Sequence, residues 1–197
     1  MLTKKEADEL IKEIKGEARG EVLKVDWDYV NEVWGEEGIK KLEDKMAELG
    51  YPLKYKDISS ASFYSLGLYN ISLLSIRDIF DLDNEEIEKM GTAIVKFSLL
   101  IKVLFKYFVS LKLIAEQAPA GWRRLYTVGD LEMSEFSEKK RYVILRIRNF
   151  KDHPVHCLLI KGYFVRFSQM IVKFPTTVRE TKCVFKGDQY HELLITW

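Results

Sequence analysis

The sequence contains few cysteines and histidines, and it lacks an excess of charge of either sign. Its 197 residues include 2 cysteines, 3 histidines, 31 lysines and arginines, and 30 aspartates and glutamates. Two cysteines are too few for a disulfide-stabilised secreted scaffold. The near-cancelling charges leave no global field that would attract nucleic acid or an anionic membrane. We therefore expect neither a disulfide framework nor nucleic-acid binding.

Targeting and membrane-spanning segments are also missing from the sequence. The N-terminus, MLTKKEADELIKEIKGE, mixes acidic and basic residues and has no apolar core of a signal peptide. The most apolar region, residues 94–115, is interrupted by Lys96, Lys102, Lys106 and Lys112. Its uncharged runs are shorter than the about twenty residues that span a bilayer. These features predict a cytoplasmic protein without a membrane span.

The motifs of several enzyme classes are absent as well. No serine has a nucleophile-elbow context, and neither a G-x-G-x-x-G nor a G-K-[ST] loop occurs. The sequence therefore shows no visible catalytic machinery, which favours a binding function over an enzymatic one.

Apolar residues recur at helical spacing in the first part of the chain. We expect a helical arm over residues 1–19 and one main domain over residues 20–197. Residues 21–25 are predicted to form a short strand, with Asp26 as the N-cap of the next helix. A long central helix is predicted from residue 85 to about residue 117. Its apolar residues cover so much of the helix surface that we expect contacts on two sides.

The pattern changes to alternation in the last third of the chain. It predicts strands over 125–132 and 141–150, a helix over 155–172, and a final hairpin of 177–185 and 189–197. Helices followed by antiparallel strands indicate an α+β fold. We expect N-terminal helices packed on a C-terminal antiparallel sheet, with the long central helix and the final β-hairpin.

Four potential metal ligands, Cys157, Glu180, Cys183 and His191, lie in this last third. Thiolate, carboxylate and imidazole form the ligand set of a tetrahedral zinc site, and four protein ligands would close it. A three-residue turn at residues 186–188 would place Cys183 opposite His191 on one face of the hairpin. Glu180 is three residues from Cys183, so it needs a β-bulge to reach the same face.

The surroundings of Cys157 leave alternatives open. Its place in the first turn of a helix would lower the pKa of the thiol and favour the thiolate that binds metal. The adjacent His156 is an alternative to Glu180 as a ligand, although a position facing solvent is favoured for it. In the opposing interpretation, both cysteines are small core residues and Glu180 is a surface charge.

The C-terminal motifs resemble the end of the 4-vinyl reductase-type domain over residues 141–197, and more loosely before that. The motifs are C-L-L-I-K-G-Y-F and V-x-E-x-x-C-x-x-x-G-x-x-x-H, and they comprise Cys157, Gly162, Tyr163, Phe164, Val178, Glu180, Cys183, Gly187 and His191. The family includes bacterial aromatic-compound sensors and is related to vesicle-tethering TRAPP subunits. The resemblance implies a zinc held by Cys157, Glu180 and Cys183, with His191 where the family has a third cysteine.

The opening RGEVLKVDWDYVNEVWGEEG is also similar to the start of heme-nitric-oxide/oxygen-binding domains. Those domains use a helix histidine as the heme ligand. This chain has no histidine before His153. A heme of that type is therefore not expected.

These observations predict a regulatory or sensory domain that binds a small hydrophobic or aromatic molecule, with a structural zinc that ties a helix to the final hairpin. We expect a homodimer and an output domain or partner protein. Two alternatives are a zinc-dependent enzyme, in which Glu180 opens a water site, and a metal-stabilised dimerisation scaffold. The predicted pocket is lined by Phe97, Ile101, Phe105, Phe108 and Tyr163.

Overall fold

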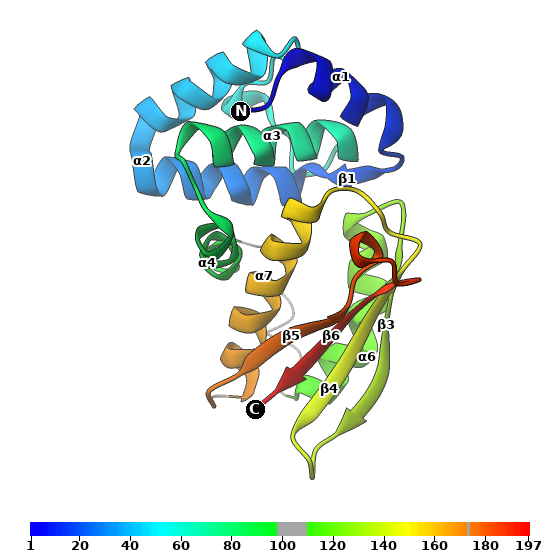
Figure 1. Cartoon of the computed structure of the whole chain (residues 1–197). Coiled ribbons are helices and arrows are strands. Elements are labelled where there is room, and N and C mark those ends of the chain that lie inside the picture. The colour runs from blue at the N-terminus through cyan, green and yellow to red at the C-terminus, as the bar shows by residue number, and fades with distance from the viewer. Residues whose placement is uncertain (98–109, 173) are drawn as a thin grey trace.

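The structure is a computed structural model that describes residues 1–97, 110–172 and 174–197. Helices make up the N-terminal half, and a four-stranded antiparallel sheet with covering helices makes up the C-terminal half (Figure 1). The predicted α+β fold is confirmed.

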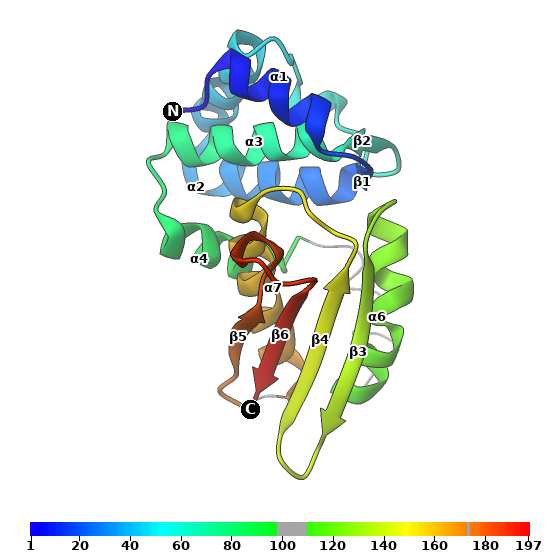
Figure 2. The ribbon, with the colours of Figure 1, turned by 45° about the vertical axis from the view of Figure 1, so that its right-hand side comes forward.

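Three helices form a layer at one end of the molecule, as both ribbon views show (Figures 1 and 2). They are joined by a two-stranded antiparallel sheet and a short 3-10 turn. The elements are α1 (Lys4–Glu13), β1 (Glu17–Arg19), α2 (Gly20–Glu48), η1 (Tyr55–Asp57), β2 (Phe63–Ser65) and α3 (Leu66–Ile79).

The start of α2 corrects the sequence prediction. Residues 21–25 are helical, and Asp26 is buried inside α2 and is not its N-cap. The strand is β1, which ends just before α2 begins. Leu23, Trp27 and Val30 recur at helical spacing and are buried. The Trp27 indole donates a hydrogen bond to Ser72 Oγ of α3 at 2.8 Å, which fixes this face of α2 against α3.

The helix predicted over residues 85–117 starts at its expected place but is shorter. Asp83 forms a capping box at the start of α4 (Asn84–Ile94), and α4 ends at Ile94. A separate helix, α6 (Leu111–Leu125), begins where Ser110 Oγ accepts a hydrogen bond from the Leu113 amide. Because α6 continues through Pro119, the strand expected from residue 125 begins only at residue 130. Residues 98–109 of the predicted helix lie outside the described residues.

The second half of the chain forms one sheet with the strand order β3-β4-β6-β5. The helices α6 and α7 lie on one side of it (Figure 2). The predicted helix at 155–172 and the final hairpin are confirmed. The elements are β3 (Asp130–Ser137), β4 (Tyr142–Arg148), α7 (Pro154–Val172), β5 (Thr177–Lys182), η2 (Val184–Lys186) and β6 (His191–Thr196).

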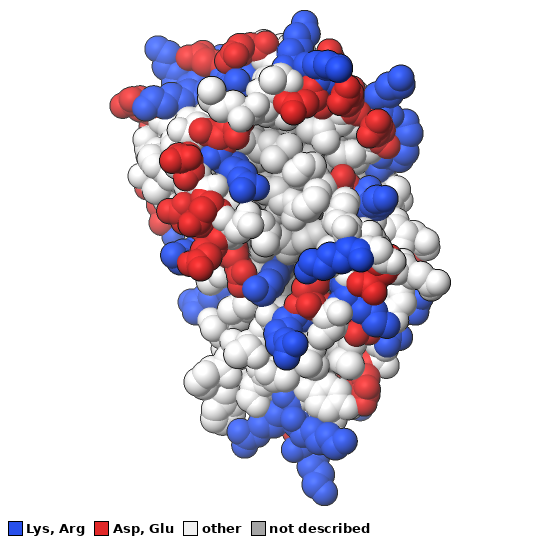
Figure 3. All heavy atoms as spheres, viewed as in Figure 1, with Lys and Arg blue, Asp and Glu red and all other residues white. Residues whose placement is uncertain are grey.

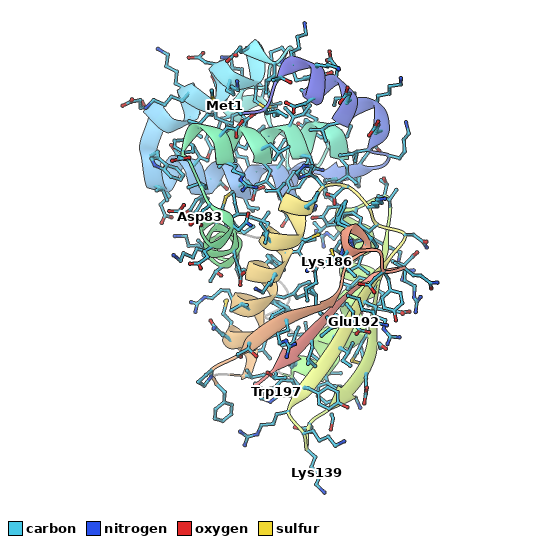
Figure 4. All side chains as sticks on the ribbon, in the orientation of Figure 1. Met1, Asp83, Lys139, Lys186, Glu192 and Trp197 are labelled. Carbon is cyan, nitrogen blue, oxygen red and sulfur yellow. The ribbon has the colours of Figure 1, made fainter. Side chains whose placement is uncertain are left out.

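The two faces of the sheet differ in polarity. Val143, Leu145 and Ile147 of β4 are buried toward the helices. On the outer face Arg146 pairs with Glu192 at 2.7 Å, and Arg148 pairs with a glutamate of β3. Figure 4 labels Glu192 on β6, and Figure 3 shows acidic and basic side chains interspersed over the same view of the molecule. The inner face is therefore the one that can enclose an apolar site.

The helices α4 and α7 pack at glycine-to-backbone distance. A Cβ atom added to Gly162 would lie 1.9 Å from the Glu88 carbonyl oxygen, and one added to Gly91 would lie 2.1 Å from the Leu159 carbonyl oxygen. The Thr92 hydroxyl donates to the Gly162 carbonyl at 3.3 Å. Since neither backbone can recede without moving its helix, α4 and α7 are mechanically coupled.

The N-terminal residues were expected to form a separate helical arm. Ala7 and Ile14 at the N-terminus are buried in the common core. The division into an arm at 1–19 and a domain at 20–197 stays a prediction.

Among the described helices, α7 is long and apolar enough to cross a membrane by length and composition. It packs between α4 and the sheet, and core helices of soluble proteins meet the same criterion.

Candidate functional site

An apolar cavity of about 120 Å³ lies between α2, α6, α7 and the start of β3. The largest share of its wall comes from α6 and α7. Its described lining residues are Glu21, Val22, Val25, Tyr69, Ile94, Ile114, Gln117, Ala118, Gly121, Trp122, Leu125, Tyr126, Leu131, His156, Leu159, Ile160, Tyr163, Phe164 and Phe167.

One end of the cavity carries a buried histidine with partners on both ring nitrogens. His156 Nδ1 lies 2.5 Å from Asp152 Oδ2, and Nε2 lies 3.3 Å from the Tyr126 hydroxyl. The Asn70 amide donates to the same Asp152 oxygen at 3.2 Å. Burial alone would raise the pKa of Asp152, but the adjacent His156 outweighs burial and lowers it. The expectation that His156 faces solvent is wrong, since the residue is 1% exposed.

A second polar group lies at the wall formed by α2 and α3. The Tyr69 hydroxyl and both carboxyl oxygens of Asp26 are buried without a hydrogen-bond partner within the described structure. Burial raises the pKa of Asp26 to about 8, and the neighbouring Tyr69 offsets only part of that effect. Tyr69 lines the cavity, and its ring centroid lies 4.9 Å from that of His156.

The four predicted metal ligands meet beside the first turn of α7. One ligand atom from each of Cys157, Glu180, Cys183 and His191 lies within 4.8 Å of the other three. The register of β5 and β6 shifts between Glu180 and Lys182, which is the β-bulge that Glu180 requires. Continuing the Lys182–Glu192 pairing by one residue brings Cys183 opposite His191. The predicted register of the hairpin is therefore present, but its strands are shorter than expected and η2 stands where a three-residue turn was predicted.

The ring of His191 is oriented for ligation. Its Nε2 lies 3.1 Å from the Phe150 carbonyl, to which only an N–H can donate. Its Nδ1 faces the cluster, 3.8 Å from Cys157 Sγ and 3.6 Å from Glu180 Oε1. Metal-bound histidines commonly donate their second ring N–H in this way. A void of about 10 Å³ lies beside Cys157, Glu180 and His191.

The electrostatics of the cluster correct one expectation. The thiol of Cys157 was expected to have a lowered pKa at the helix N-terminus. Its pKa is instead raised, first by burial and then by the neighbouring Cys183 and Glu180. Burial would also raise the pKa of Glu180, but His191 and the Lys186 ammonium outweigh burial and lower this pKa to about 2. Figure 4 labels Lys186 in the turn that joins β5 and β6.

The cavity and the metal-ligand cluster share one structural support. The Phe150 carbonyl accepts from His191, and the Phe150 ring lies against Tyr126 and His156 with both centroid distances at 5.6 Å. His156 and Cys157 are consecutive residues of α7, one facing the cavity and the other the cluster. A shift of the first turn of α7 would therefore change both sites.

The predicted pocket residues have different positions. Tyr163 lines the cavity. Phe97 packs half-buried against the core, outside the lining of the cavity. Ile101, Phe105 and Phe108 lie outside the described residues. The sequence did not point to Tyr69, Tyr126 or Trp122 as lining residues, because aromatic residues in helices usually indicate core packing and these are distant in the chain.

Comparison with solved structures identifies the architecture. An H-NOX protein from S. oneidensis in the Fe(II)NO ligation state matches with a TM-score of 0.69 and 14% identity, over 90% of this chain and 97% of that one. An oxygen-binding H-NOX domain related to soluble guanylate cyclases, in its oxygen complex, matches with a TM-score of 0.64 and 10% identity, over 90% and 94%. The chain has the H-NOX fold. A third match, described for modulation of heme redox potential through porphyrin distortion, has a TM-score of 0.63 and 10% identity, over 91% and 99%.

The H-NOX fold confirms the looser N-terminal resemblance but not the main one. No family model and no curated protein matches the sequence, so the likeness to the 4-vinyl reductase-type domain is unsupported. The prediction of zinc as the cofactor, made from the ligand types and strengthened by that likeness, is wrong by these comparisons. The H-NOX neighbours are described with iron or heme. The four-ligand cluster is thus left without an assigned ion.

Proposed function

We propose that this chain is a sensory domain whose cavity binds one small, mostly apolar molecule. The observation that carries the proposal is the cavity itself, whose wall is almost entirely apolar and is formed mainly by α6 and α7. A cavity of comparable size, about 150 Å³, binds a single benzene ring in another protein. A ligand of about one aromatic ring is therefore the size that this cavity accommodates.

Binding would be transmitted by α7. This helix contributes Leu159, Ile160 and Tyr163 to the cavity wall. On another side, Gly162 contacts the backbone of α4. A ligand that binds one position of α7 better than another shifts the equilibrium toward that position. The outer surface of α4 would then carry the change to an output domain, a partner protein or a second copy of the chain; the homodimer stays a prediction.

Heme is the ligand that the fold suggests, but the described residues do not fit it. Ligand pockets for drug-sized molecules usually measure about 300–1,000 Å³, well above this cavity of about 120 Å³. His156 is the single histidine of the described lining, and both of its ring nitrogens have partners. The described lining also contains no lysine or arginine to pair with the two propionates of a heme. Hemin titration should therefore give no saturable 1:1 Soret change, and a saturable 1:1 complex would contradict this reasoning.

The proposed cavity function is tested with toluene as the probe. Thermal unfolding and Trp122 fluorescence are measured with and without toluene. We expect a raised unfolding midpoint and a saturable fluorescence change in the unsubstituted chain. Ala118→Leu extends a side chain into the cavity and should weaken toluene binding at least tenfold. Ala120→Leu makes the same change at an exposed position of α6 and is the matched control. Equal binding in both variants would exclude the cavity as the site, and no binding in the unsubstituted chain would exclude neutral hydrocarbons as its ligands.

We also propose that Cys157, Glu180, Cys183 and His191 hold one metal ion. The supporting observation is the convergence of four ligand atoms within 4.8 Å. Such an ion would fasten α7 to β5 and β6 and deprotonate the two thiols, whose pKa values burial raises in its absence. Elemental analysis of the purified chain should find about one transition-metal ion per chain, and Cys183→Ser should lose it. Less than a tenth of an equivalent after metal reconstitution would refute the site.

A further inference from the structure

Tyr69 on the cavity wall and Asp26 beside it are buried polar groups. Tyr69 and Asp26 are each 1% exposed. Neither the Tyr69 hydroxyl nor either Asp26 oxygen has a hydrogen bond of normal geometry within the described structure, although the two side chains lie close enough to interact with each other. Burying polar groups without well-formed hydrogen bonds is destabilising. A buried polar group without a well-formed hydrogen bond is uncommon in native proteins, and one explanation is a bound molecule that supplies the partner.

The position of these groups connects them to the cavity. Tyr69 is a lining residue, and so is Val25, the residue before Asp26 on α2. Asp26 and Tyr69 interact with each other, and burial raises the pKa of Asp26 to about 8, an effect that Tyr69 offsets only in part. A ligand that brings a hydrogen-bond donor with positive charge to this wall would supply what the carboxyl group lacks.

The rest of the lining also favours a cation. Six of its residues have aromatic rings, whose faces attract an ammonium group. The described lining includes no lysine or arginine that could pair with a carboxylate ligand. A ligand with a carboxylate would therefore be disfavoured. The aromatic residues are Tyr69, Trp122, Tyr126, Tyr163, Phe164 and Phe167.

We propose that the cavity selects small amines in their protonated form, with the ammonium group at the Tyr69 hydroxyl, next to which Asp26 lies outside the lining, and an apolar ring against Trp122 and Tyr163. The inference rests on the proposed function and names the chemical class of its ligand. The cavity volume of about 120 Å³ limits that class to molecules with about one ring. Charge at one end and an apolar body at the other would distinguish the ligand from neutral hydrocarbons and from carboxylates.

The test compares three ligands of one shape that differ in charge: benzylamine, benzyl alcohol and benzoate. Isothermal titration calorimetry at pH 7 with the full chain should show benzylamine binding at least tenfold more tightly than benzyl alcohol, and benzoate more weakly than both. Asp26→Asn and Tyr69→Phe should each reduce the preference for the amine at least fivefold. Asp28→Asn and Tyr55→Phe are matched controls, because these residues bond to each other at 2.5 Å outside the cavity lining.

The outcomes separate this inference from the proposed function. If benzyl alcohol or benzoate binds as tightly as benzylamine, the selection for amines is refuted and the cavity function stands. An amine preference that survives both Asp26→Asn and Tyr69→Phe would refute the assigned contacts. If none of benzylamine, benzyl alcohol, benzoate and toluene binds, the cavity function itself is refuted.

Discussion

The Phe150 carbonyl accepts a hydrogen bond from Nε2 of His191 at 3.1 Å, which leaves Nδ1 of His191 directed at the thiol of Cys157. This relationship predicts the tautomer of the ring and supports the proposal that His191 is a metal ligand. We expect His191→Ala to reduce cobalt(II) affinity by at least about tenfold, the loss typical when the surroundings of a metal site are disturbed.

Thiolate-to-cobalt absorption measures this affinity directly. His153→Ala is the matched control, because His153 lies at the start of α7 and is not one of the four ligands. Unchanged absorption in His191→Ala would show that the ring does not bind the ion.

The close approach of α4 and α7 predicts a large loss of stability on a minimal substitution. In Gly162→Ala the new methyl group would meet the Glu88 carbonyl at 1.9 Å, so the two helices must separate. We expect a loss of about 3 kcal/mol in the free energy of unfolding, at the upper end of the usual cost of overpacking. Denaturant unfolding measures it.

Gly187→Ala provides the comparison for this prediction. Gly187 has a φ of 97° and no atom within 4 Å of an added Cβ, so only backbone strain of about 1–2 kcal/mol is expected. If Gly162→Ala proved no more damaging than Gly187→Ala, α4 and α7 would not be in rigid contact.

The buried carboxyl group of Asp26 predicts a stability that falls with rising pH. Its pKa is raised from 3.8 to about 8 by burial, so the folded chain holds a proton that the unfolded chain releases above pH 4. Stability from this group is therefore complete below about pH 4 and declines up to about pH 8, by at most about 1.4 kcal/mol per pH unit.

Asp26→Asn removes this proton linkage while keeping the shape of the side chain. The variant should be more stable than the unsubstituted chain at pH 8 and nearly equal to it at pH 4. Parallel pH profiles of the two free energies of unfolding would contradict the assignment of Asp26 as a protonated carboxyl group.

Several parts of the fold could be predicted because the signals were local. The alternation in β4 and the register of the final hairpin each depend on neighbouring residues, although the 3-10 segment η2 takes the place of the three-residue turn expected at 186–188. The cluster of four ligands also followed from short-range reasoning, since hairpin register set Cys183 against His191 and the need for a bulge at Glu180 followed from counting residues.

The cavity could not be predicted in the same way. Tyr69, Tyr126 and His156 come from three separate segments, and only the packing of α3 and α7 brings them together. The apolar residues that predicted one helix from residue 85 to about residue 117 gave no sign of the end of α4 at Ile94 or of the cap at Ser110. His156 can be buried because its ring pairs with Asp152, four residues earlier in the chain. Nothing in the sequence indicated that these two side chains would pair inside the core.

Hydrogen–deuterium exchange with and without saturating toluene tests the central claim, that a ligand in the cavity acts on α4 through α7. We predict slower amide exchange in α7 and in α4 when toluene is present. Exchange in α1 should be unchanged, and Ala118→Leu should abolish the effect while Ala120→Leu preserves it. Exchange in α7 and α4 that is unaffected by bound toluene, or slowed equally in α1, would contradict the account.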